Sequence, residues 1–432
     1  MANFSLSNIF KGDKVIWMIF FFLCLISVIE VYTSSPQITY KTGNYIAPMI
    51  KHCGLLLLGV AAMVVTLNVK CGYFKVLTPF MLALSFGLMI WLFLTTKEAT
   101  NEATRWTSIL GIQFQPSEIA KGSLVLATAR ILSAMQTGHG ADPKAMKYIL
   151  VICAFLVTPI ALENLSTGVL ICLVIFIMMF IGQVPGQQLG KLLGVAVLSM
   201  AVVVTLTLLL GNEKKAEAAK QAQKTEMVAE AGKNTAEKVK KEKTLVEKIF
   251  HRFDTWKSRI YKFLDNKELK PSELNYDDDQ QVIFANISIV QSNIIGKGPG
   301  SSTGCITIPQ AFSDFIFAII IEEMGILGAI FVAGLYILLL FRTGRIASRC
   351  ENTFPALLAM GFALLIVTQA LFNMAVAVGL APVTGQPLPL ISKGGTSSII
   401  NCIYIGVILS VSRTAQKRME TVGNQLVETV EE

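Results

Sequence analysis

Charge is scarce in this sequence outside one segment. Of its 432 residues, 66 are charged, and 30 of these fall between residues 213 and 280. The other 36 are spread over 364 residues, too few to cover a water-soluble surface. Because 53% of the chain is also apolar and the mean hydropathy is +0.59, the composition excludes a soluble globular enzyme and predicts a polytopic membrane protein.

Histidine and closely spaced cysteine are scarce as well. The chain has three histidines, and its eight cysteines lie far apart without a CxxC pair. This pattern favours neither a zinc site nor a disulfide framework, and it indicates that cysteine serves as a small apolar residue. The net charge of +8 comes without a basic cluster interleaved with aromatics, so no nucleic-acid partner is expected.

Ten apolar stretches are predicted to cross the membrane as helices, which makes the fold all-α. The first follows Lys11 and Lys14 and lacks a small-residue cleavage signal, so we expect a retained helix. The fifth and sixth form a tight pair around residues 163–165. The ten stretches are 15–34, 53–69, 76–96, 115–134, 148–162, 166–184, 192–211, 315–341, 354–378 and 397–412.

Lysine and arginine in the short loops predict the orientation. With a cytoplasmic N-terminus, the inner segments hold thirteen of these residues and the short outer loops hold five. The expected organisation is transmembrane helices 1–7 in residues 1–211, an extracytoplasmic loop in 212–313, helices 8–10 in 314–412 and a cytoplasmic tail in 413–432. Within the loop we expect a charged arm (213–280) and an amphipathic, glycine-rich part (281–304).

Several charged residues fall in or beside the predicted spans: Glu30, Glu118, Lys121, Arg130, Glu322 and Glu323. A charge at mid-membrane costs about 2.5 to 3.5 kcal/mol, so most of these side chains should pair or line a wet cavity. Glu118 and Lys121 stand three residues apart on one helix and can pair with each other. The pair could act as a packing clamp or as part of a functional cavity.

The segments rich in glycine, proline, serine and isolated charges all fall on the outer side of this topology, which indicates one built site. In one of them, Ser392, Lys393, Gly394 and Gly395 precede a helix whose N-terminus suits a phosphate or pyrophosphate. In another, Asp314 opens the eighth span. Asp314 could act as a general base toward a sugar hydroxyl, or it could cap that helix.

Four motifs together resemble the SEDS family of peptidoglycan polymerases. They are RW(x)8QPSEIAK at residues 105–121, GKGPGSS at 296–302, SDFIFAIIIEEMGILG at 313–328 and GLAPVTGQPLPLISKGGTSSIIN at 379–401. They stand in the family's order and spacing, and the similarity covers nearly the whole chain apart from residues 213–270. The opening 25-residue segment from Lys11 is more similar to the division branch (FtsW-like) than to the elongation branch (RodA-like).

The resemblance implies a membrane glycosyltransferase of the bacterial cytoplasmic membrane, with both termini cytoplasmic and the active site on the outer face. It would transfer the growing glycan from undecaprenyl pyrophosphate to the GlcNAc 4-hydroxyl of lipid II, forming a β-1,4 link with inversion, in cell division. Asp314 matches the catalytic base. The matching substrate-binding positions are Arg105, Trp106, Gln115, Glu118, Lys121, Lys297, Glu322, Ser392, Lys393, Gly394 and Gly395.

The implied partners are lipid II, the lipid-linked glycan, a class B penicillin-binding protein and other division proteins of the membrane. The resemblance fixes no cofactor, and a divalent cation (Mg²⁺ or Mn²⁺) is one candidate for neutralising the pyrophosphate. This chain has Lys393 where the family has Tyr, so Lys393 becomes a candidate pyrophosphate contact. Three alternatives remain open: a lipid II transporter, an elongation-type polymerase, and a scaffold for a transpeptidase.

Overall fold

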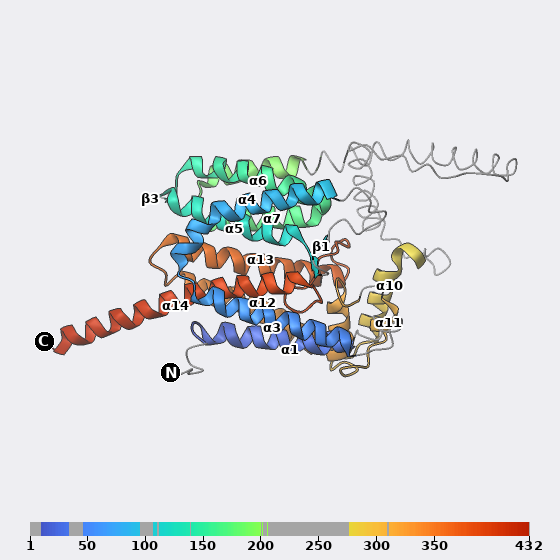
Figure 1. Ribbon diagram of the computed structural model, residues 1–432. Coiled ribbons are helices and arrows are strands. Elements are labelled where there is room, and N and C mark those ends of the chain that lie inside the picture. Colours follow the sequence, from blue (N-terminus) through green and yellow to red (C-terminus); the bar gives the residue numbers. More distant parts are fainter. Residues whose placement is uncertain are drawn as a thin grey trace. The chain divides into compact units, whose positions relative to one another are not determined.

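The computed structural model describes residues 10–33, 46–95, 107–109, 112–138, 140–199, 201, 205, 276–308 and 311–431, which are helical over most of their length (Figure 1). The chain forms two compact units, Met1–Val184 with Asn266–Glu432, and Pro185–Asp265. In the second unit, residues 186–199 form a helix that begins before the predicted seventh segment (192–211) and overlaps its first part. The charged arm falls outside the described residues, except for residues 276–280.

The first unit holds the other predicted helices. Before the long loop they are α1 (Lys14–Thr33), α3 (Ala47–Asn68), α4 (Cys71–Thr95), α5 (Pro116–Ala134), α6 (Pro143–Glu163) and α7 (Leu165–Ile181). After it come α10 (Tyr276–Gln291), the short α11 (Gly304–Thr307), α12 (Ile316–Ala347), α13 (Thr353–Ala377) and α14 (Thr396–Glu431). Two short antiparallel hairpins pair β1 (Thr107–Ile109) with β2 (Ile112–Phe114) and β3 (Gln136–Thr137) with β4 (Gly140–Ala141).

Seven described helices are long and apolar enough to cross a membrane: α1, α3, α4, α6, α12, α13 and the first part of α14. The prediction of a polytopic helical membrane protein is confirmed. Helices α5 and α7, which the sequence predicts as spans, are not among these seven. Helix α7 is slightly too short, with 17 residues, and α5 carries three charged side chains. As predicted, α6 and α7 form a tight pair separated only by Asn164, whose side chain caps α7 at Ser166.

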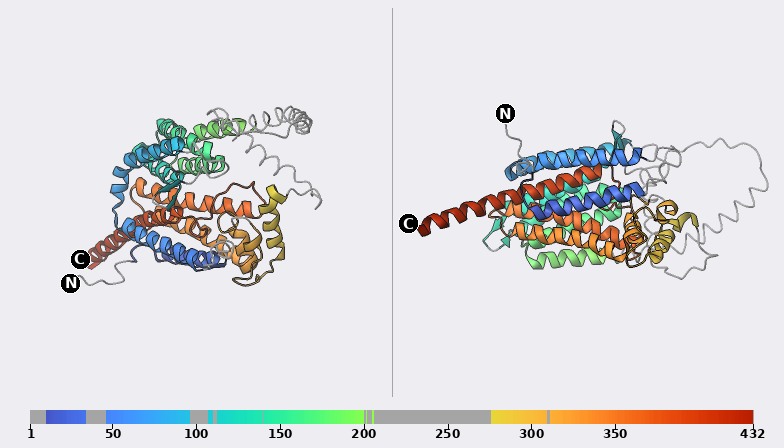
Figure 2. Two further views of the ribbon diagram at one scale, coloured as in Figure 1. Left: turned by 45° about the vertical axis from the view of Figure 1, so that its right-hand side comes forward. Right: turned by 90° about the horizontal axis from the view of Figure 1, so that it is seen from below.

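Burial explains how the charged helix α5 is tolerated. Helix α5 packs against α4, α6 and α13 (Figure 2). Thirteen of its first fourteen residues are buried. The more apolar helices α3, α4 and α6 instead leave most of their residues exposed or half-buried. Such apolar exposure suits a lipid surface, whereas the charges of α5 are kept inside the protein.

Helix α12 is broken at Gly325, where the sequence predicts one continuous span. Gly325 has φ +69°, and a Cβ there would overlap the carbonyl oxygen of Ile294. The break frees the carbonyl oxygens of Glu322 and Glu323, which accept hydrogen bonds from the amides of Lys297 and Gly298, both at 2.9 Å. The glycine-rich loop thus supplies donors that the helix itself no longer provides.

Two further segments refine the prediction. Most of the expected tail at 413–432 is helical, because α14 continues as one helix to Glu431, at the end of the bundle where α1 begins (Figure 1). The amphipathic segment begins in α10, which packs against α12 (Figure 2). Ala285 of α10 belongs to the buried cluster around Phe315 and Ile319, while Val290 is 83% exposed.

Candidate active site

Asp314 lies in the turn that leads into α12, and its side chain is half-buried. The hydroxyl of Ser313 donates a hydrogen bond of 2.8 Å to Asp314 Oδ1. The structure assigns the cap position of α12 to Phe315, one residue after Asp314. Asp314 thus presents a carboxylate at the mouth of α12 that accepts from a neighbouring hydroxyl.

Asn373 of α13 fixes the backbone of this turn. Its Nδ2 donates to the carbonyl oxygen of Asp314 at 2.8 Å and to that of Gln386 at 2.7 Å. The side-chain amide of Gln386 in turn donates to the hydroxyl of Thr167 on α7. All three side chains are buried, so α7, α13 and the loop after α13 hold the Asp314 turn in one position.

The segment before α14 is joined directly to the Asp314 turn. Ser392 Oγ donates to the carbonyl oxygen of Ser313 at 2.6 Å, and the amide of Lys393 donates to the carbonyl oxygen of Phe312 at 3.1 Å. The Lys393 ammonium lies 5.3 Å from the centre of the Phe312 ring. Burial, followed by repulsion from Lys51, holds the pKa of Lys393 below its ordinary value.

The glycines after Lys393 shape the start of α14. Gly395 has φ +53°, a left-handed conformation that glycine adopts without strain. The amide of Ser397 donates to the carbonyl oxygen of Gly394 at 2.9 Å. The hydroxyl of Ser397 is buried and has no hydrogen-bond partner among the described residues. The first turn of α14 thus holds this buried hydroxyl four residues after Lys393.

Glu118 and Lys121 form the predicted pair, with Lys121 Nζ 2.8 Å from Glu118 Oε1 and both side chains about 1% exposed. Lys121 also donates to Gln369 Oε1 at 2.8 Å, and Gln369 donates to the carbonyl oxygen of Pro387 at 3.1 Å. This network therefore reaches the same loop that holds Asp314. Gln115, at the start of α5, is buried as well.

Lys297 and Glu322 form an ion pair. Lys297 Nζ lies 2.7 Å from Glu322 Oε1. The same carboxylate accepts hydrogen bonds from the hydroxyl of Ser302 (2.5 Å), from the amide and hydroxyl of Thr303 (3.1 and 2.8 Å) and from the amide of Gly304 (3.0 Å). These contacts anchor the glycine-rich loop on α12.

Comparison with known proteins identifies the family of this chain. The model of the family described as "Cell cycle protein", which carries the names FtsW, RodA and SpoVE, matches residues 13–230 and 243–417. The chain belongs to this family. The SEDS resemblance of the four motifs is therefore confirmed, and the match includes every candidate site residue named above.

Curated relatives cover nearly the same length. The chain is 26% identical over 408 residues to the probable peptidoglycan glycosyltransferase FtsW of Geobacter sp. (strain M18), covering 93% of this chain and 96% of the relative. It is 24% identical over 401 residues to the peptidoglycan glycosyltransferase MrdB of Escherichia coli K12, covering 92% and 93%. Family members of both names thus resemble it at similar levels.

Solved structures share the fold. A chain of a peptidoglycan synthase complex aligns with a TM-score of 0.65 and 21% identity, covering 94% of this chain and 99% of its own length. The rod shape determining protein RodA of Thermus thermophilus aligns with a TM-score of 0.59 and 20% identity, covering 94% and 98%. At these identities the likeness concerns the helical fold alone.

The structure brings only part of the predicted site into direct contact. Ser392 and Lys393 touch the Asp314 turn, with Gly394 and Gly395 directly after them. Glu118 and Lys121 are linked to the same loop through Gln369, whereas Lys297 and Glu322 form a separate anchor. Arg105 and Trp106 lie outside the described residues.

Sequence reasoning missed Asn373 and Gln369. These two polar residues stand four positions apart in an otherwise apolar span, which places them on one face of the helix. An amide pair on one face of a membrane helix is a recognisable signal, because a buried polar side chain needs a partner.

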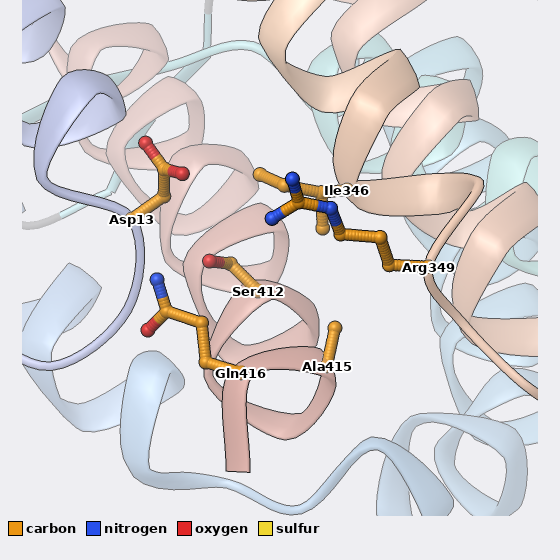
Figure 3. A pocket seen from close by; sticks show the side chains of 6 residues that line it. All are labelled: Asp13, Ile346, Arg349, Ser412, Ala415 and Gln416. Atoms are coloured by element: carbon orange, nitrogen blue, oxygen red, sulfur yellow. The ribbon is translucent and has the colours of Figure 1, made fainter. Parts of the chain in front are cut away.

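No metal-binding cluster accompanies this site among the described residues, and a small cavity lies away from it. The described residues contain no group of three or more histidine, cysteine or acidic side chains that could hold a metal ion, so they form no protein-only metal site at Asp314. At the other end of the helices, a cavity of about 20 Å³ is lined by Asp13, Ile346, Arg349, Ser412, Ala415 and Gln416 (Figure 3). It has room for about one water molecule and lies far from Asp314 along α12.

Proposed function

We propose that this chain is a peptidoglycan glycosyltransferase that polymerises lipid II into glycan strands. The observation that carries this proposal is a half-buried carboxylate, Asp314, held beside Lys393 at the helix ends of a chain whose relatives are named peptidoglycan glycosyltransferases. The geometry supplies a proton acceptor and a cation on two hydrogen-bonded segments. A glycosyl transfer to a hydroxyl needs both groups.

In the proposed reaction, Asp314 accepts the proton of the acceptor GlcNAc 4-hydroxyl. The hydroxyl oxygen attacks the anomeric carbon of the donor MurNAc, the bond to the pyrophosphate oxygen breaks, and undecaprenyl pyrophosphate leaves with inversion. Lys393 offsets the negative charge of the departing diphosphate. Asn373 and Ser392 hold the two segments together, so the base and the cation stay positioned during the transfer.

We further propose that the Asp314 end of the helices faces the outside of the cytoplasmic membrane, with both termini inside, as the loop charges predict. A class B penicillin-binding protein is the proposed transpeptidase partner. A role in division is favoured over elongation by the N-terminal segment. A divalent cation would be bound jointly by Asp314 and substrate phosphates, since Mg²⁺ commonly takes one or two carboxylates together with phosphate ligands.

Lipid II transport is the second candidate function, and one observation favours it. A broken helix is common in transporters, and α12 is broken at Gly325. Here, however, the carbonyl oxygens freed by the break are taken up by the loop at Lys297 and Gly298. The break is therefore explained by loop anchoring, and glycosyl transfer remains the better supported function.

Lipid II polymerisation by the purified full-length chain, with its transpeptidase partner and moenomycin present, tests the proposal. Wild type should form glycan ladders, and Asp314→Asn should form none while unfolding at the wild-type temperature. Glu351→Gln, at an exposed carboxylate beyond α12, is the control and should be fully active. Ladders from Asp314→Asn would overturn the base assignment. If the wild-type chain moves lipid II across the membrane and forms no glycan, the transporter function is favoured.

A further inference from the structure

Lys51, on α3, is an unexplained cation near the candidate site. It lies in the second turn of that helix with its side chain exposed. Helix α3 packs along α14 and beside α1 (Figure 1). Lys51 therefore belongs to the same end of the bundle as Lys393.

A chain of hydrogen bonds ties this part of α3 to the loop of Lys393. His52 Nε2 lies 2.8 Å from Ser27 Oγ, and Ser27 Oγ donates to the carbonyl oxygen of Ile391 at 2.7 Å. His52 and Ser27 are buried, so the connection is internal. Because Ile391 is two residues from Lys393, the α3 turn that carries Lys51 is positioned next to Lys393.

The two ammonium groups repel each other, and Asp314 lies on the turn that is hydrogen-bonded to Lys393. Within the part of the chain that the structure describes, the ion pairs involve Glu118, Glu322 and Asp13, and neither Lys51 nor Lys393 takes part in them. The mutual repulsion helps to lower the pKa of Lys393. Lysines that are held close together despite their mutual repulsion commonly mark a binding site for an anion.

Other groups around Lys393 also suit an anion. The buried Ser397 hydroxyl lacks a partner among the described residues and lies in the first turn of α14, where amide groups point out of the helix. Phe312 offers its ring face to Lys393, which orients the ammonium without neutralising it. Two cations, one hydroxyl and a helix N-terminus can together contact the several oxygens of a diphosphate.

We propose that Lys51 and Lys393 together bind the diphosphate of a prenyl-linked substrate, with Lys51 as a substrate-binding residue that the sequence motifs do not indicate. This inference rests on the proposed function for the identity of the lipid. Lys51 would hold one phosphate while Lys393 holds the phosphate nearer to Asp314. The diphosphate would thus be neutralised by cations from α3 and from the loop before α14.

Binding of undecaprenyl pyrophosphate to the full-length chain in zwitterionic nanodiscs tests the inference. Lys51→Gln should raise the Kd about tenfold, the loss expected for one charge-assisted contact. Lys51→Arg should stay within about twofold of wild type. Lys75→Gln, at an exposed lysine at the start of α4 and the other end of the helices, is the matched control and should leave the Kd unchanged.

The melting temperature separates binding from structure. Removing Lys51 relieves repulsion, so Lys51→Gln should melt at or above the wild-type temperature while binding more weakly. An unchanged Kd, or a lowered melting temperature with proportionate loss of binding, would overturn the inference. Equal competition by tenfold excess phosphatidylglycerol would show a site for any lipid phosphate and would also overturn it. A different outcome separates this inference from the proposed function. If the wild type binds undecaprenyl pyrophosphate through Lys51 but forms no glycan, the binding site is supported and the proposed function is overturned.

Discussion

The side-chain amide of Asn373 donates one hydrogen bond to the carbonyl oxygen of Asp314 and another to that of Gln386. One buried residue of α13 therefore holds both the turn with the proposed base and the loop that leads to Lys393. Asn373 is a positioning residue, because its contacts are with backbone groups.

Asn373→Ala should lower kcat by about ten- to a hundredfold with a small change in KM. Losing two buried hydrogen bonds costs about 1 to 3 kcal/mol and lets the Asp314 turn move away from its working position. The measurement is lipid II polymerisation at varied substrate concentration, together with the melting temperature. Asn352→Ala, at an exposed position before α13, should change neither quantity. A full kcat in Asn373→Ala would show that the turn holds its position without this residue.

Gly325→Ala should destabilise the protein by more than about 2 kcal/mol. Alanine is strained at φ +69°, and its Cβ would overlap the carbonyl oxygen of Ile294, so the glycine-rich loop would detach from α12. Thermal unfolding in detergent and protease cleavage within residues 297–304 measure the two effects. Gly334→Ala, in the same helix, has open space around its Cβ and should be neutral or slightly stabilising. Equal stability of the two variants would contradict the proposed role of the break.

Glu118→Gln and Lys121→Met should each cost about 3 to 5 kcal/mol, because each leaves a lone charge inside the protein. The double variant should recover much of that loss. A double-mutant cycle on the melting temperature measures the coupling between the two residues. If the double variant regains stability without polymerisation, the pair lines a functional cavity. If it regains both, the packing-clamp interpretation is correct.

The alkaline limit of substrate binding should depend on Lys51. Lys393 has a pKa below its ordinary value of 10.5, caused by burial and then by Lys51. The other titratable groups around its loop are His52, linked through Ser27, and Asp314, on the turn bonded to the loop. Binding needs the charged ammonium, so it should weaken as pH rises through this lowered pKa. Lys51→Gln raises that pKa and should shift the limit to higher pH. A pH series of Kd values for undecaprenyl pyrophosphate measures the shift, and an unmoved limit would refute it.

The same lowered pKa has a defined effect on stability. Between the folded-state pKa of Lys393 and 10.5, the unfolded chain binds the proton more strongly than the folded chain does. The free energy of unfolding should therefore rise with pH across this window. Lys393→Met should remove that contribution, so its stability should vary less with pH there.

The sequence by itself determined the membrane class, the positions of the helices and the Glu118–Lys121 pair. These features are local: apolar runs of about 20 residues have one stable form in lipid, and residues three apart on a helix face each other. The motif at Asp314 was also local, and it identified the acid without showing whether it would cap the helix. Periodicity carried no sign that the apolar run of α12 would break at Gly325.

Only the tertiary structure decided which distant residues meet. The contacts from Asn373 to Asp314 and from Ser392 to Ser313 join segments 59 and 79 residues apart, and the chain from His52 through Ser27 to Ile391 joins three elements. Such contacts depend on how whole helices pack, because each buried polar group takes whichever partner the packing brings within reach. The same packing pairs Lys297 with Glu322 and brings Lys51 close enough to Lys393 to repel it. The sequence around Lys297 and Lys51 does not indicate these different surroundings.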